Sequence, residues 1–184
     1  THCGVVFCQG LNETTNKLKV LAGTDSQTNL MNRRNMWRSI KVEISNYEKY
    51  GTSFAMIISD IDNFKSINDQ FGHESGDYAL IGAANIIKKA LRDRDQVARW
   101  GGEEFLILLP ESDIEAATRV AERIKNRLNE TAIIHNGNQV AITMTFGVGV
   151  YNGNIDACFR AADKALYEGK REGKNTVRCW GKKG

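Results

Sequence analysis

The chain is poor in the residues that mark several specialised classes of protein. Only one of its 184 residues is proline, so rigid proline-rich linkers are not expected. None of its four cysteines (Cys3, Cys8, Cys158 and Cys179) lies in a Cys-x-x-Cys pair. We therefore expect free thiols in a reducing compartment and no cysteine-based zinc site. The formal net charge is only +3, which argues against the basic stripe of a dedicated nucleic-acid-binding protein.

Long hydrophobic runs are also missing. The longest apolar runs are far shorter than the roughly 20 residues that a membrane-spanning helix needs. Thr1 begins no recognisable secretory signal. We therefore expect a cytoplasmic segment that makes no membrane contact itself, while regions upstream could tether a longer protein. With 41% hydrophobic and 26% charged residues, the chain suits one globular domain with a sizeable core.

The first 22 residues differ in pattern from the rest. Leu11, Thr14, Leu18 and Leu21 fall at the a and d positions of a heptad pattern. That pattern covers only about one and a half heptads, too few to predict a coiled coil. We interpret residues 1–22 as the tail of an upstream domain with a linker helix, and residues 23–184 as one catalytic domain. The alternative is an N-terminal helix that packs on its own domain.

Periodicity predicts an α+β fold. Helices are expected over residues 33–47, 78–91, 114–128 and 156–168, and strands over 54–59, 97–100, 105–109 and 176–180. Residues 131–135 and 139–150 are expected to form a second hairpin that turns at 136–138. The embedded βαββαβ order predicts a ferredoxin-like core, with a central, mainly antiparallel sheet and surrounding helices. That order by itself places the helices on one side of the sheet.

Carboxylates gather at two expected strand ends. The stretch "RWGGEEF" places Glu103 and Glu104 beside two glycines at a hairpin tip, and Asp60 and Asp62 follow the strand "FAMIIS". Alternation along a strand puts Asp60 and Asp62 on one face, where they could meet the glutamates. Such oxygen ligands suit Mg²⁺, and glycine backbone lets a bulky ligand approach closely. The alternatives are solvated turns and a helix cap.

The next segment, "NFKSINDQFGHESGD", adds groups suited to a nucleotide. Lys65 could neutralise a phosphate, and Asn68 and Asp77 carry the donors and acceptors that match a guanine edge. The alternatives are turn chemistry at Asn68-Asp69 and an N-cap at Asp77. Taken singly, each alternative is the commoner use of its residue type. The three segments in this order and spacing favour the functional interpretation.

These motifs together resemble the GGDEF family of diguanylate cyclases. The family signature Gly-Gly-(Asp/Glu)-Glu-Phe is intact at residues 101–105. "DIDNFKSINDQFGHESGD" matches the family's long upstream block throughout, and "TDSQTNLMNRR" matches its D-x-L-T-x-L-x-N-R-R motif at all but one position. "AADKALYEGKREGKN" is similar to the closing helix. The resemblance runs from about Thr24 to the end of the chain.

The resemblance implies a nucleotidyl-cyclase-like fold and a specific reaction. Two GTP molecules are condensed into cyclic di-GMP with release of two pyrophosphates. Each domain holds one GTP, so two copies must face each other in a homodimer that is transient or driven by upstream regions. Mg²⁺, with Mn²⁺ as an alternative, is implied at Asp60, the carbonyl of Ile61, Glu103 and Glu104. Glu103 is also implied as general base for the 3′-hydroxyl.

The resemblance also assigns the nucleotide and product sites. The residues implied for GTP are Phe64, Lys65, Asn68, His73, Asp77, Gly101, Gly102, Lys170 and Lys174. Lys65 stabilises phosphate charge, and Lys170 and Lys174 contact the terminal phosphates. An R-x-x-D motif formed by Arg92 and Asp95 resembles the family's inhibitory site for the product, with Arg123 as a second contributor. The alternative for Arg92 and Asp95 is a solvated charged loop.

Three positions depart from the family pattern. Gln27 replaces a leucine that helps to wall the guanine, Asn29 replaces a glycine, and Lys174 replaces an arginine. Lysine keeps the charge of arginine but loses its forked geometry. Two alternative functions stay open. One is a catalytically silent module that binds GTP or cyclic di-GMP, and the other is a nucleotide cyclase or polymerase-like enzyme with other products.

Overall fold

The computed structural model describes residues 23–135 and 137–180. The tail and linker helix expected over residues 1–22 therefore lie outside the described residues, as does Asn136 of the expected turn. The helices are α2 (Arg33–Tyr50), α3 (Phe64–Phe71), α4 (His73–Ala90), α5 (Ile114–Glu130) and α6 (Ile155–Arg171). The strands are β1 (Met31–Asn32), β2 (Phe54–Ile61), β3 (Gln96–Arg99), β4 (Glu104–Pro110), β5 (Ile133–His135), β6 (Asn138–Val140), β7 (Met144–Val150) and β8 (Val177–Cys179).

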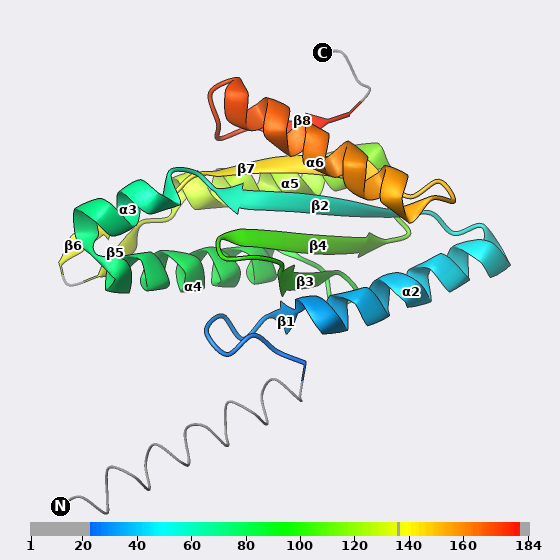
Figure 1. The fold of residues 1–184 in the computed structure, drawn as a ribbon, viewed down its shortest axis with the longest axis horizontal. Coiled ribbons are helices and arrows are strands. Elements are labelled where there is room, and N and C mark those ends of the chain that lie inside the picture. The colour runs from blue at the N-terminus through cyan, green and yellow to red at the C-terminus, as the bar shows by residue number, and fades with distance from the viewer. Residues whose placement is uncertain (1–22, 136, 181–184) are drawn as a thin grey trace, which may run out of the picture.

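A six-stranded sheet in the order β1-β3-β4-β2-β7-β8 forms the centre of the domain (Figure 1). The inner strands β3, β4, β2 and β7 pair antiparallel, and the edge pairs β1–β3 and β7–β8 are parallel. The ferredoxin-like α+β core predicted from the element order is thus confirmed. It places the end of β2 directly beside the start of β4, because Asp60 pairs with Glu104.

Helices cover both faces of the sheet, so the expectation of helices on one side is wrong. One core packs α4 and α5 against the face that carries Ala55 and Ile57. A second core packs α2 and α6 against the face that carries Phe54, Met56 and Ile58. The cause is the composition of β2: Phe54 to Ile58 are all 2% exposed or less, so both faces of this strand need a cover.

The segment between β2 and β3 is more helical than the sequence predicts. Asn68 lies inside α3, and α4 begins at His73 rather than Tyr78. Turn chemistry at Asn68 and an N-cap at Asp77 are therefore both wrong. The sequence shows no sign of α3 or of the early start of α4, because Gly72, at φ 85°, ends one helix and begins the other without a side-chain cap.

The expected hairpin over 131–150 is also corrected. Residues 139–150 do not form one strand: β6 pairs with β5 in a separate two-stranded sheet, whereas β7 pairs with β2 and β8. Residues 141–143 carry the chain from one sheet to the other. Buried Ile142 packs into the core there, which explains why hydrophobicity alone suggested a continuous strand.

Glycines of β7 bring α6 close to the sheet. A Cβ atom on Gly149 would lie 2.5 Å from the carbonyl oxygen of Cys158, and one on Gly147 would collide with the backbone of Ala162. Only glycine allows this approach. The close packing fixes the C-terminal turn of α6, which carries Lys170, against the end of β2.

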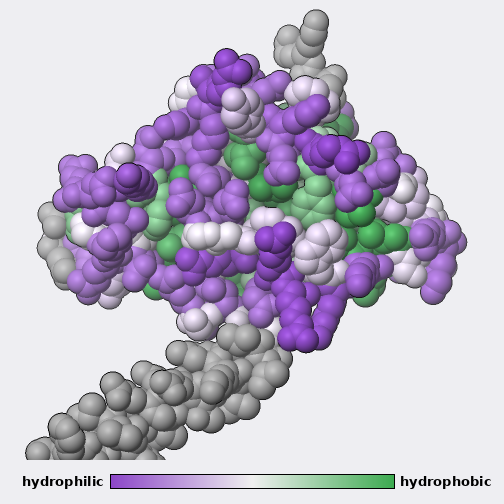
Figure 2. Space-filling model, in the orientation of Figure 1, coloured by the Kyte–Doolittle hydropathy of each residue, from purple (hydrophilic) through white to green (hydrophobic). Residues whose placement is uncertain are grey.

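Polar residues cover most of the face shown in Figure 2. On that face, apolar residues gather between α6 and α2, where the partly buried rings of Trp37, Trp100 and Phe159 pack together. No described helix is both long and apolar enough to cross a membrane. Cys158 and Cys179 are free thiols, and burial raises the pKa of Cys158 to about 12.

Candidate active site

The β3–β4 hairpin and the end of β2 bring three carboxylates together. The amide of Ile61 donates to the carbonyl of Glu103 at 3.2 Å, and Asp60 pairs with Glu104 in the ladder. Burial, and next the charge of Asp60, raise the pKa of both Glu103 and Glu104 above their ordinary values. The pairing of β2 with β4 therefore places Asp60 close enough for its charge to act on both glutamates.

Lys170 reaches this cluster from the last turn of α6. Its ammonium group contacts the Oδ1 atom of Asp60, lies 2.9 Å from Oδ1 of Asp62, and lies 3.4 and 3.3 Å from the carbonyl oxygens of Asp60 and Ile61. Burial alone would lower the pKa of Lys170, but the bonds to Asp60 and Asp62 outweigh it and raise the pKa. Lys170 is therefore a charged, partly buried partner of the cluster.

Asp62, which the sequence analysis placed on one face with Asp60, has a structural role that the sequence did not predict. Its side chain is 1% exposed and accepts hydrogen bonds from the hydroxyls of Thr143 and Thr145, at 2.8 and 2.7 Å, and from the amide of Asn175 at 2.9 Å. Burial would raise the pKa of Asp62, but these bonds and Lys170 hold it below its ordinary value. The sequence did carry one signal for this role: Asp62 directly follows the buried strand β2, two residues after Asp60.

The oxygens around Lys170 fit a hard divalent cation. Within residues 23–135 and 137–180, no three carboxylate, imidazole or thiol groups converge into a ready-made metal site. A Mg²⁺ ion here would therefore need main-chain and substrate oxygens as well, which is the usual coordination of this ion beside phosphates. The Lys170 ammonium already stands as a cation among oxygens of Asp60 and Ile61.

Residues of the expected guanine site lie on α3 and the start of α4. A Cβ atom on Gly76 would collide with Oδ1 of Asn68 and would lie 3.3 Å from the ring of Phe64. The missing side chain at Gly76 thus lets Asn68 and Phe64 approach the helix turn that carries exposed Asp77. His73 and Lys65 are exposed on the same two helices. Lys174 contacts the side chain of Asn63, directly before α3.

The two glycines of the signature, Gly101 and Gly102, are required for different structural reasons. A Cβ atom on Gly101 would lie 2.6 Å from the Oε2 atom of Glu104, whereas one on Gly102 would meet no atom of the described part of the chain within 4 Å. Gly101 therefore makes room for a carboxylate of this chain. Gly102 has no such steric reason, and the open space beside it is available to a ligand.

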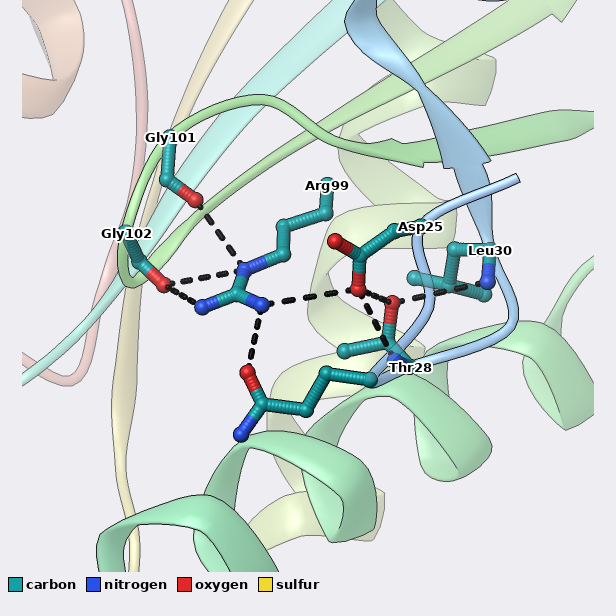
Figure 3. Close-up of polar contacts among 7 residues, drawn as sticks. Asp25, Thr28, Leu30, Arg99, Gly101 and Gly102 are labelled. Atoms are coloured by element: carbon teal, nitrogen blue, oxygen red, sulfur yellow. Dashed lines mark hydrogen bonds and ion pairs between the residues drawn. The ribbon is translucent and has the colours of Figure 1, made fainter. Parts of the chain in front are cut away.

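Arg99 holds the hairpin to the turn that follows residue 23 (Figure 3). Its guanidinium donates to the carbonyls of Gly101 and Gly102 on one side, and to Asp25 and Gln27 on the other. The bond to Oε1 of Gln27 measures 2.6 Å. Gln27, which departs from the family pattern, thus joins a polar contact that a leucine could not make.

The other two departures lie at left-handed backbone positions. Asn29 has φ 56° and Lys174 has φ 65°. Asparagine tolerates this region better than most residues, so Asn29 suits a position where the family pattern has a glycine.

The R-x-x-D motif lies at the opposite end of β3 from the hairpin, roughly 10–13 Å away by strand length. Arg92, Asp95 and Arg123 line one cavity of about 120 Å³, together with Arg119, which the sequence analysis did not single out. The amide of Arg92 donates to Asp95 at 2.9 Å, and Arg123 donates to the carbonyl of Ala90 at 2.6 Å. Three arginines around one small cavity suit an anionic ligand.

Comparison with known proteins identifies the family. The model "Diguanylate cyclase, GGDEF domain" matches residues 22–176. Among curated proteins, diguanylate cyclase DosC of Escherichia coli is 38% identical over 161 residues, which are 86% of this chain and 35% of that protein. This chain therefore spans about a third of the length of such relatives.

Solved structures agree. The active GGEEF domain of a diguanylate cyclase from Vibrio cholerae has a TM-score of 0.77 and 34% identity, and the alignment covers 84% of this chain and 99% of that one. The GGDEF domain of DgcB from Caulobacter crescentus, solved with c-di-GMP, has a TM-score of 0.83 and 29% identity over 88% of this chain and 94% of that one. The chain belongs to the GGDEF family of diguanylate cyclase domains.

Proposed function

We propose that this chain is the catalytic output domain of a signalling protein and condenses two GTP molecules into cyclic di-GMP with release of two pyrophosphates. The observation that carries the proposal is the hairpin, where Glu104 pairs with Asp60, Glu103 and Glu104 both feel the charge of Asp60, and Asp60 contacts the Lys170 ammonium. A silent binding module would not need both glutamates in this electrostatic environment. Relatives named as diguanylate cyclases support the same reaction.

The residues divide between metal binding and proton transfer. Asp60, the carbonyl of Ile61, Glu103 and Glu104 would hold Mg²⁺ or Mn²⁺. When bound, the ion supplies positive charge to the phosphates of GTP. Glu103 accepts the proton of the attacking 3′-hydroxyl. In the metal-free chain, burial and then the charge of Asp60 raise the pKa of Glu103.

The remaining groups bind and orient the nucleotide. Lys65, Lys170 and Lys174 neutralise phosphate charge, and the amides at the start of α3 offer further donors. Asn68 and Asp77 read the guanine edge, while Phe64, His73 and the glycines of the hairpin line the site. Guanine-reading groups favour cyclic di-GMP over the products of another nucleotide cyclase or a polymerase-like enzyme. The cytoplasmic location and the absence of nucleic-acid binding stay predictions.

Incubation with GTP and Mg²⁺, followed by mass spectrometry of the product, tests the reaction. We expect the initial rate per mole of protein to rise with protein concentration. The chain has one such hairpin and the product has two equivalent linkages, so two copies must meet. A fused dimeric coiled coil should raise the rate at low concentration. A rate that is independent of concentration, in a protein that sedimentation shows to be monomeric throughout, would exclude the two-copy mechanism.

The cavity that Arg92 lines is proposed as the inhibitory product site. Replacing Arg92 with alanine removes a forked donor, and we expect cyclic di-GMP affinity to fall about 10- to 100-fold in titration calorimetry, as for loss of a charge-assisted bond. Arg94→Ala is the matched control. Arg94 belongs to the same loop but pairs with Glu111 at 2.6 Å and does not line this cavity. Equal affinities for both variants would refute the assignment.

A further inference from the structure

One cation of the chain itself already occupies the oxygens that a metal ion would use. Lys170 touches Oδ1 of Asp60 and lies 3.3 Å from the carbonyl oxygen of Ile61, and both of these groups belong to the proposed metal site. Its charge also acts on Glu103 and Glu104. A divalent cation and an ammonium group repel each other, so they cannot share the same carboxylate oxygen at full affinity.

We propose that Lys170 is an internal counter-ion that keeps a divalent cation out of the nucleotide-free site and that moves from Asp60 to phosphate oxygens when a nucleotide arrives. This inference rests on the proposed function for the identity of the incoming phosphate. It assigns Lys170 a second role besides phosphate binding, namely coupling of metal uptake to nucleotide binding.

The structure provides Lys170 with an anchor for this movement. Asp62 bonds Lys170 at 2.9 Å, and Asp62 is itself held by Thr143, Thr145 and the amide of Asn175. Within residues 23–135 and 137–180, Asp60 has no comparable set of bonds, and its side chain is 18% exposed against 1% for Asp62. The flexible lysine stem can therefore release the more exposed Asp60 while it keeps its bond to the rigid Asp62.

The experiment is a titration of the nucleotide-free chain with Mn²⁺, followed by electron paramagnetic resonance of the free ion. We expect Lys170→Met to bind Mn²⁺ at least about tenfold more tightly than the parent chain, because the substitution removes the competing positive charge from a partly desolvated site. Addition of a non-reacting GTP analogue should tighten Mn²⁺ binding to the parent far more than to Lys170→Met. Unchanged or weaker Mn²⁺ binding by Lys170→Met would overturn the proposal.

A control separates this role from a general loss of positive charge. Lys164→Met removes a charge from the same helix α6, where Lys164 packs over Trp180. This variant should bind Mn²⁺ much as the parent does, and tightening by Lys164→Met equal to that of Lys170→Met would overturn the proposal.

Circular dichroism checks each variant for folding, and Lys170→Gln replaces Lys170→Met if the latter unfolds. Since glutamine is neutral, the same tightening is expected. The titration needs no turnover, so its outcome is independent of the product assay. Absence of cyclic di-GMP would refute the proposed function alone, whereas equal Mn²⁺ affinities would refute the counter-ion role alone.

Discussion

Glu103→Gln is expected to lower the turnover of GTP by about a thousandfold, the order found when one preorganised charge-stabilising group is lost. The substitution removes both a metal ligand and the proposed base. The fold should survive, because Glu103 lies in the hairpin tip and has no side-chain hydrogen bond or ion pair among the contacts found within residues 23–135 and 137–180. Initial rates of pyrophosphate release, measured above the concentration at which two copies meet, provide the test.

Glu111→Gln is the matched control for this experiment. Glu111 directly follows β4, at the end away from the hairpin, and forms an exposed ion pair with Arg94. Exposed ion pairs contribute at most about 1 kcal/mol, so this variant should keep the parent's rate. A Glu103→Gln variant that turns over GTP as fast as Glu111→Gln would show that Glu103 neither holds the metal nor accepts the proton.

Asp62→Asn is expected to lower the free energy of unfolding by about 3 kcal/mol, near the low end for breaking a buried charge pair, because Lys170 is partly exposed. Asparagine keeps the size of Asp62 but removes the negative charge opposite Lys170. Its NH₂ group would also face the three groups that now donate to Asp62, two threonine hydroxyls and one backbone amide. Urea unfolding at neutral pH measures the loss. Asp69→Asn, at an exposed position of α3, is the control.

The pH dependence of this loss has a defined sign. The folded pKa of Asp62 lies below its ordinary value of 3.8, so the carboxylate stabilises the fold fully above pH 3.8. That contribution disappears as the pH falls through the folded pKa. The difference between Asp62→Asn and the parent should therefore be constant from pH 7 down to about 4 and shrink only below that. A difference under 0.5 kcal/mol at neutral pH, of the size usual for surface changes, would contradict this structural role of Asp62.

Local patterns of the sequence determined the fold class, the family and the convergence of the carboxylates. Side chains alternate in direction along β2, and a Gly-Gly turn joins β3 to β4. Both features act over short distances, so they specify which strands pair and which residues stand at their ends. The unbroken apolar run from Phe54 to Ile58 even contained the signal for helices on both faces. The helix α3 was missed because it is only eight residues long and its N-terminal cap makes no side-chain bond.

Only the tertiary structure decided which distant side chains meet. Lys170 and Asp62 are more than 100 residues apart, and their bond depends on how closely Gly147 and Gly149 allow α6 to pack on β7. The contact of Gln27 with Arg99 likewise joins residues that are 72 positions apart, and Arg119 reaches the cavity beside Arg92 from a different element, α5. Residue type states what a side chain can bind, but the close packing of the core selects its partner.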